Sequence, residues 1–124
     1  MKEDISKYLN INLNNKFYLK IVFEINNEKI SDCMNIIKNI KMEGIEFTLP
    51  TKSILDENNC TLTISTKVGT RVQDITLQKI KDFTDSIKEL KSVSEIVWVV
   101  YDNDDNKIYR YEYNSKLNIE DFEA

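Results

Sequence analysis

The stretch SEIVWVVYDNDDNKIYRYEY, residues 94–113, constrains the fold more than any other part of the chain. An apolar run over 96–101 is followed by the polar residues 102–106 and then by an alternating segment over 108–113. Branched and aromatic side chains suit strands, whereas Asp and Asn tolerate the tight backbone of a turn. The stretch therefore predicts a β-hairpin, with its first strand inside a sheet and its Tyr-rich second strand at an edge.

Apolar periodicity in the rest of the chain predicts two helices among further strands. The predicted strands are residues 16–25, 45–49, 60–68, 95–101 and 108–113, and the predicted helices are residues 28–43 and 76–91. Asn26 or Asn27 caps the first helix, Gly44 ends it in a left-handed conformation, and Pro50 ends the strand that follows. We read residues 1–15 as an N-terminal segment with one or two helical turns near Ile5.

The order β-α-β-β-α-β plus one extra C-terminal strand predicts an α+β fold of the ferredoxin-like split βαβ type. In this fold an antiparallel sheet carries two helices on one face. Residues 1–124 are then a single domain, because 124 residues suffice for one hydrophobic core. Residues 114–124 form an acidic tail that is either a loosely docked segment or a short helix.

The acidic charge is concentrated near the C-terminus. The formal net charge is −4, and residues 95–124 carry eight acidic and three basic side chains. Binding to phosphates draws on Lys and Arg, so this balance argues against nucleic acid and anionic membranes as partners. It favours a basic protein partner, while the plain alternative is that the acids only keep the protein soluble.

Catalytic and metal-binding chemistry find little support in the residue types. The chain has no His, the commonest general base, and we expect a protein without enzymatic activity and without a cofactor. Asp102, Asp104 and Asn106 have the spacing of a calcium loop, but the later ligand positions are missing, so we interpret them as a turn. Cys33 and Cys60 are expected to pack as small apolar residues in a reducing, cytoplasmic protein.

The sheet face away from the helices is predicted to carry an apolar triplet. Depending on register, the triplet is Ile96, Trp98 and Val100 or Val97, Val99 and Tyr101. An exposed apolar patch usually marks an interaction site. Cover by a terminal segment, self-association as a homodimer and binding of another protein all satisfy this expectation.

Two ligand-binding domain classes share the predicted topology but not the residues that define them. RNA-recognition domains stack bases on aromatic side chains, whereas residues 61–66 here read TLTIST. Regulatory domains of the ACT type carry a glycine-containing turn after the first strand, where residues 26–29 here read NNEK. Neither class is favoured by these residues.

Our leading functional hypothesis is a non-enzymatic protein-binding domain with an acidic, Tyr-rich surface. Tyr and Trp offer large contact areas, and neighbouring acids steer a basic partner. An inhibitor or immunity-type protein, which neutralises a basic toxin or enzyme, has this character. The expected partner-binding residues are Trp98, Tyr101, Asp102, Asp104, Asp105, Tyr109, Arg110, Tyr111 and Glu112. The alternative is a dimeric small-ligand sensor or regulatory module.

Overall fold

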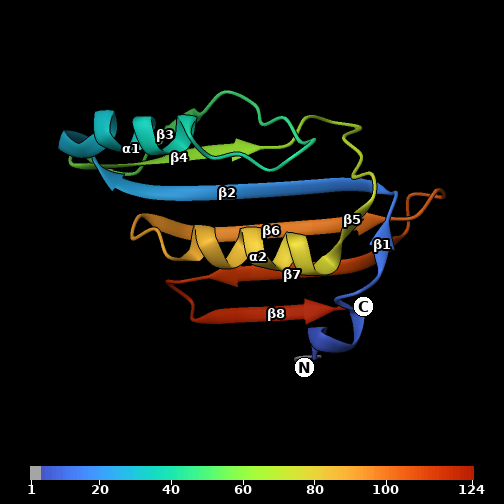
Figure 1. The fold of residues 1–124 in the computed structure, drawn as a ribbon. Coiled ribbons are helices and arrows are strands. Elements are labelled where there is room, and N and C mark those ends of the chain that lie inside the picture. Colours follow the sequence, from blue (N-terminus) through green and yellow to red (C-terminus); the bar gives the residue numbers. More distant parts are fainter. Residues whose placement is uncertain (1–3) are drawn as a thin grey trace.

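The computed structural model describes residues 4–124 and consists mainly of a six-stranded antiparallel sheet with both helices on one face (Figure 1). In spatial order the strands are β3 (Thr51–Ile54), β4 (Asn59–Ser65), β2 (Lys16–Asn26), β6 (Val93–Tyr101), β7 (Lys107–Asn114) and β8 (Ile119–Glu123). The helices are α1 (Ile30–Lys38) and α2 (Leu77–Lys88). The α+β class, the two helices and the antiparallel sheet are as the sequence predicts.

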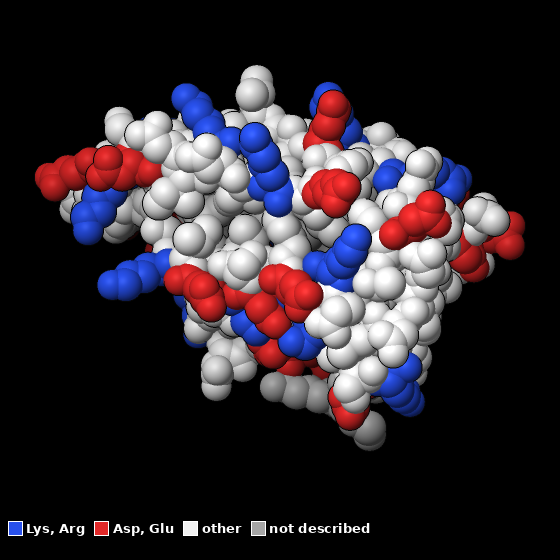
Figure 2. All heavy atoms as spheres, viewed as in Figure 1, with Lys and Arg blue, Asp and Glu red and all other residues white. Residues whose placement is uncertain are grey.

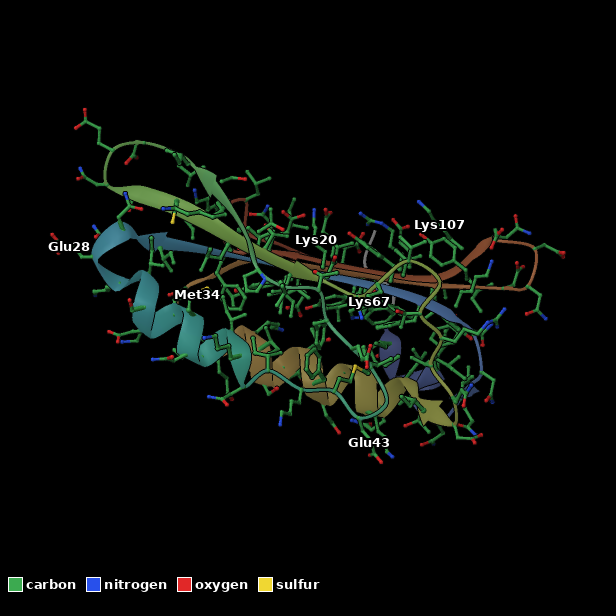
Figure 3. The ribbon with its side chains drawn as sticks, turned by 90° about the horizontal axis from the view of Figure 1, so that it is seen from above. Lys20, Glu28, Met34, Glu43, Lys67 and Lys107 are labelled. Carbon is green, nitrogen blue, oxygen red and sulfur yellow. The ribbon has the colours of Figure 1, made fainter. Side chains whose placement is uncertain are left out.

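The side chains of strand β2 alternate between the two faces of the sheet, as its alternating sequence predicts. Its buried side chains are Phe17, Leu19, Ile21, Phe23 and Ile25, each at most 5% exposed. The register of β6 against β2 places Trp98 opposite Leu19, so the indole lies on the same buried face. Figure 3 shows Lys20 and Lys107 on the opposite, helix-free side of the sheet. The hydrophobic core therefore lies between the sheet and the helices.

Helix α2 covers the middle of the sheet and has the predicted apolar stripe. Its N-cap is Thr76, whose hydroxyl oxygen accepts a hydrogen bond from the Lys79 amide at 3.3 Å. Ile80 and Ile87 are buried against the sheet. The buried Thr84 hydroxyl donates to the Ile80 carbonyl at 2.8 Å, so its only polar side-chain group is satisfied within the helix.

The N-terminal segment packs against the core and pairs with the residues that precede α2. The 3-10 turn η1 (Ile5–Tyr8) packs against the core, which confirms the predicted helical turn, although residues 1–3 lie outside the described residues. Strand β1 (Asn12–Leu13) then pairs with β5 (Ile75–Thr76) in a separate two-stranded sheet. This pairing ties the segment to the residues just before α2.

The first helix is shorter than the predicted 28–43. Residues 27–29 form a 3-10 turn, η2 (Asn27–Lys29), and α1 ends at Lys38, where the Asn39 side chain donates to the Asn35 carbonyl at 2.9 Å. The helix ends early because the segment after it buries the side chains of Met42 and Ile45 in the core. Gly44, at φ +77°, lies in the turn between them and is not the C-cap of the helix.

The second predicted strand, 45–49, is also displaced. Phe47 makes only an isolated bridge to Thr66, and the strand forms after Pro50 as β3. The reason is a short turn between β3 and β4. There the Asp56 carboxylate accepts from the amides of Asn58 at 2.7 Å and Asn59 at 2.8 Å. β3 ends at Ile54 and β4 begins at Asn59, so this turn pairs the residues that follow Pro50 with β4.

The acidic tail is a strand and not a helix or a loose segment. Residues 119–123 form β8, which pairs with β7 along five residue positions. β7 is therefore an internal strand, contrary to the edge position that its sequence suggests. The tail pairs with β7 because this buries the apolar Phe122 among the aromatic side chains of the neighbouring strands.

Charged side chains of both signs are interspersed over the helix-covered face of the molecule (Figure 2). They gather most densely below the middle of the view, over α2 and the adjoining strands. Among the helices of residues 4–124, none has the length and apolar composition needed to cross a bilayer.

Candidate functional site

The turn at residues 102–106 is organised by one carboxylate. Asp102 accepts hydrogen bonds from the backbone amides of Asp104 at 2.8 Å and Asn106 at 2.9 Å, and these bonds, that from Asn106 first, lower the pKa of Asp102. Asp105 has a left-handed backbone at φ 63°. The Asp- and Asn-rich sequence thus acts as the predicted hairpin turn. In residues 4–124 no three His, Cys, Asp or Glu side chains are grouped to hold a metal ion.

A cleft of about 350 Å³ lies beside this turn, at the end of the sheet where β2 begins and β6 ends. We call it the hairpin-end cleft; its lining residues are Lys16, Phe17, Tyr18, Lys67, Val68, Gly69, Thr70, Tyr101 and Asp105. Val68 is fully exposed and Tyr18 is 37% exposed. An exposed valine beside two tyrosines gives this end of the sheet an apolar surface.

Val68 is held outward by a tight turn. The Thr70 amide donates to the Lys67 carbonyl at 3.1 Å, and the Thr70 hydroxyl donates to the same oxygen at 2.6 Å. Gly69 has φ +82°, the left-handed conformation that a turn of this kind needs at its third position. The valine side chain is therefore fixed in solvent by the backbone, which lowers the entropy lost if a partner covers it.

Both lysines that line the hairpin-end cleft form ion pairs. Lys16 pairs with Asp105 at 2.6 Å, and Lys67 pairs with Glu46 at 3.2 Å. Both basic side chains of the cleft are thus matched by an acid. The other charged residues at this end are Asp102 and Asp104 of the turn and the exposed Arg71 and Lys107. The Asp102 carboxylate is turned toward the backbone amides of the turn, whereas Asp104 is exposed.

Two predicted partner-binding residues, Arg110 and Glu112, lie on the helix-free face. They form an ion pair with each other at 3.5 Å, and they face Val99 and Val97 of β6. On the other side of β6, Lys20 is paired in register with Val97. Side chains of the flanking strands therefore surround the apolar triplet of this face.

This arrangement resolves the register that the sequence left open. The triplet on the helix-free face is Val97, Val99 and Tyr101, and Val99 is only 5% exposed in the isolated chain. Tyr18 and Arg110 flank Val99 from β2 and β7. The sheet's own long side chains thus supply much of the cover that was expected from a terminus, a second copy or a partner.

Three predicted aromatic contacts lie on the helix side of the sheet. Trp98 is 0% exposed and Tyr111 is 8% exposed, with their rings stacked at a centroid distance of 5.6 Å. Tyr109 packs edge-on against Tyr8 at 5.7 Å and stacks on Phe122 at 6.1 Å. These rings build the core in this structure and offer a partner little surface.

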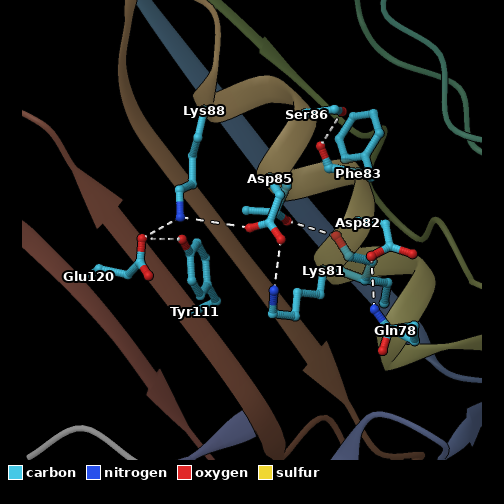
Figure 4. A network of polar contacts seen from close by, with 11 residues as sticks. Gln78, Lys81, Asp82, Phe83, Asp85, Ser86, Lys88, Tyr111 and Glu120 are labelled. Atoms are coloured by element: carbon cyan, nitrogen blue, oxygen red, sulfur yellow. Dashed lines mark hydrogen bonds and ion pairs between the residues drawn. The ribbon is translucent and has the colours of Figure 1, made fainter. Parts of the chain in front are cut away.

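A polar network links α2 to the two C-terminal strands (Figure 4). The Tyr111 hydroxyl donates to Glu120 at 3.2 Å, and Lys88 contacts the same carboxylate at 2.5 Å and Asp85 at 3.7 Å. Lys81 contacts Asp85 from the other side at 2.7 Å. Burial first, and then the Glu120 charge, raise the pKa of Tyr111 far above its ordinary value of 10.

The nine predicted residues therefore do not form one surface. Tyr101 and the acids of the turn stay together at the hairpin-end cleft, Arg110 and Glu112 occupy the helix-free face, and the other three line the core. The sequence prediction did not include Val68 or Tyr18 among the partner contacts. It placed Val68 at the end of the strand predicted over 60–68, whereas β4 ends at Ser65. A valine followed by glycine between two polar segments is a turn signal that places an apolar side chain in solvent.

No protein-family model matches the chain, and neither the curated proteins nor the solved structures that were searched include a match.

Proposed function

We propose that the chain is a non-enzymatic domain that binds a basic protein partner through the hairpin-end cleft and the adjacent acidic turn. The observation that carries this proposal is Val68, fully exposed on a rigid turn next to Tyr18 and Tyr101. Apolar and aromatic anchors surrounded by polar groups are the usual composition of protein contact sites. Asp104, which is exposed on the turn, adds a negative charge that would help to steer a basic partner.

We also propose that the chain has the ferredoxin-like split βαβ topology. The spatial order β3-β4-β2-β6, with antiparallel neighbours and both helices on one face, supports it. Strands β7 and β8 extend this unit at one edge. The fold alone indicates no function, because many functions share it.

An inhibitor or immunity-type role, with neutralisation of a basic toxin or enzyme in the cytoplasm, is the form of protein binding that we favour. The excess of acidic side chains in residues 95–124 supports a positive charge on the partner. Cys33 and Cys60 are buried free thiols, which supports a reducing compartment. The experiments below distinguish binding of a foreign partner from formation of a homodimer through the same cleft.

The test is affinity capture from a lysate of the source organism with three forms of the protein. These are the wild type, the double variant Tyr18→Ala, Val68→Ala, and the control Leu117→Ala, which truncates another exposed apolar residue, at 68% exposure, on the β7–β8 turn. We expect a basic protein to be retained by wild type and control and lost by the double variant. Captured proteins that are the same for all three forms would refute the proposed surface.

A second measurement tests the charge. Asp104→Lys is expected to slow association with the captured partner, and raising the ionic strength from 0.05 to 0.5 M should reduce the wild-type association rate more than that of the variant. Light scattering of each form shows whether the chain pairs with itself. A dimer that only the double variant dissociates would assign the cleft to self-association.

The dimeric small-ligand module that the sequence also allows makes a different prediction. A ligand would raise the melting temperature of the isolated protein in a concentration-dependent way, without any protein partner.

A further inference from the structure

Two clefts lie along one side of helix α2, between it and the end of α1 with the chain that follows. The first has a volume of about 650 Å³, and its lining includes residues 41–44, Arg71, Asp74, Ile75 and Lys79. The second has a volume of about 390 Å³, and its lining includes Ile36, Ile40, Ile87 and Leu90. Lys41 and Phe83 line both clefts, so the two adjoin, and we call them together the interhelix groove.

The α2 side chains of the groove lie in one row. Lys79, Phe83 and Ile87 follow one another at intervals of four residues, which places them on one face of the helix. At about 1.5 Å per residue, this row is about 12 Å long. Helix α1 contacts β2 and α2 contacts β6, so the two helices cover different strands and the groove runs between them (Figure 1).

The end of the groove near the start of α2 favours an anion. Lys41, Arg71 and Lys79 line it, and none of them forms an ion pair within residues 4–124. Two acids line the same end. Figure 3 shows Glu43 on the side of the helices that faces away from the sheet, and Asp74 accepts a hydrogen bond from a side-chain amide of β1 at 3.5 Å. Basic side chains therefore outnumber acidic ones here, although the net charge of the chain is −4.

The other end of the groove is apolar. Ile36 is 47% exposed, and Ile40 and Leu90 also keep part of their side chains accessible. Ile87, which is 5% exposed, lies deeper in the same cleft. Among residues 4–124, Lys41 is the only charged one that lines this end. A guest that fits both ends is apolar along most of its length and carries a negative charge at one end.

We propose that the interhelix groove binds a medium-chain fatty acid. The carboxylate lies among Lys41, Arg71 and Lys79, and the hydrocarbon chain runs past Phe83 toward Leu90. An extended chain of about ten carbon atoms matches the row of α2 side chains, because each bond of about 1.5 Å advances the chain by about 1.25 Å. This inference does not rest on the protein-binding function, because none of the described residues that line the groove also lines the hairpin-end cleft.

Decanoate is the probe that tests this site, added below its micelle concentration and followed by ¹H–¹⁵N NMR. Decanol and decyltrimethylammonium have the same chain with a neutral or a cationic head group, and acetate has the head group without the chain. We expect saturable shifts with decanoate in residues 36–44 and 79–90, at least tenfold weaker binding of decanol, and no saturable shift with the other two. No saturable shift up to about 5 mM decanoate, equally tight binding of the cationic probe, or shifts centred on other elements would overturn the proposal.

A pair of charge variants assigns the head group to its residues. The double variant Arg71→Gln, Lys79→Gln removes two positive charges from the groove and is expected to weaken decanoate binding at least tenfold. The control Lys52→Gln, Lys107→Gln removes two positive charges from exposed positions on β3 and β7 and should leave the binding unchanged. Equal losses in both double variants would indicate a general charge effect and refute the site.

A second pair assigns the hydrocarbon chain. Ile36→Asp places a carboxylate at the apolar end of the groove and should abolish saturable binding of decanoate. Ile54→Asp changes an isoleucine that is 78% exposed on β3, outside the groove, and should bind decanoate like wild type. Unchanged binding by Ile36→Asp would refute the placement of the chain. The Tyr18→Ala, Val68→Ala variant should also bind decanoate like wild type, so failure of either proposal leaves the other measurable.

Discussion

Trp98→Ala tests whether this residue is a core residue, as its position indicates, or an exposed partner contact, as its neighbourhood in the sequence suggests. The indole is 0% exposed and packs against Phe17, Tyr111 and Phe122 with ring centroids 5.6 to 6.4 Å away. Truncating a buried Trp to Ala costs about 3–5 kcal/mol, from lost apolar burial and the cavity left behind. A residue at a free surface would cost less than about 0.5 kcal/mol.

This free energy converts into a large shift of the melting temperature. An unfolding entropy of about 2.1 cal/mol/K per residue gives about 0.26 kcal/mol/K for 124 residues, or about 4 °C per kcal/mol. We therefore expect Trp98→Ala to lower the melting temperature by about 12–20 °C. Trp98→Phe, which refills part of the space, should fall between this variant and the wild type.

Thermal unfolding followed by circular dichroism measures the shift, because the variants lack the fluorescent indole. Val68→Ala is the matched control, since Val68 is fully exposed and its truncation should change the melting temperature by about 2 °C or less. A Trp98→Ala protein that melts within about 4 °C of wild type would refute the buried position of the indole. It would also contradict the placement of Trp98 and Tyr111 together on the buried face of the sheet.

The two turns at the hairpin end yield further predictions. Asp102 has a lowered pKa, so its stabilising effect is complete above its ordinary value of 3.8 and is lost as the pH falls through the lower value of the folded state. Asp102→Ala should therefore lower the free energy of unfolding at pH 7 and make it depend less on pH below pH 4. Urea titrations at several pH values measure both effects. A pH dependence unchanged from wild type would contradict the role of the carboxylate. Gly69→Ala meets no atom within 4 Å, but its left-handed φ of +82° should cost about 1–2 kcal/mol, or about 4–8 °C; an unshifted melting curve would show that the turn relaxes.

Local patterns were sufficient to predict several elements. The alternation of residues 16–25, the run and turn over 96–106 and the apolar stripe of the second helix all appear in the structure within a few residues. Each depends on periodicity and turn chemistry that neighbouring residues supply by themselves. The side chains of Cys33 and Cys60 are likewise buried, as predicted for cysteines that pack as small apolar residues.

Other features could not be read locally because long-range packing decided them. The helix at Ile30 stops early to bury Met42 and Ile45, and the strand predicted at 45–49 forms beyond Pro50, next to the turn that Asp56 holds. The tail at 119–123 becomes a strand because β7 offers it a paired edge and a place for Phe122.

The sequence by itself determined that residues 108–113 form an alternating strand after a turn, but not which side of that strand is buried. Both of its faces carry apolar and polar atoms, so either register satisfies the local pattern. The bulge between Val100 and Tyr101, together with Tyr8 and Phe122 on the helix side, turns Tyr109 and Tyr111 into the core. Only the tertiary structure could decide this, because the contacts that bury those rings come from both ends of the chain.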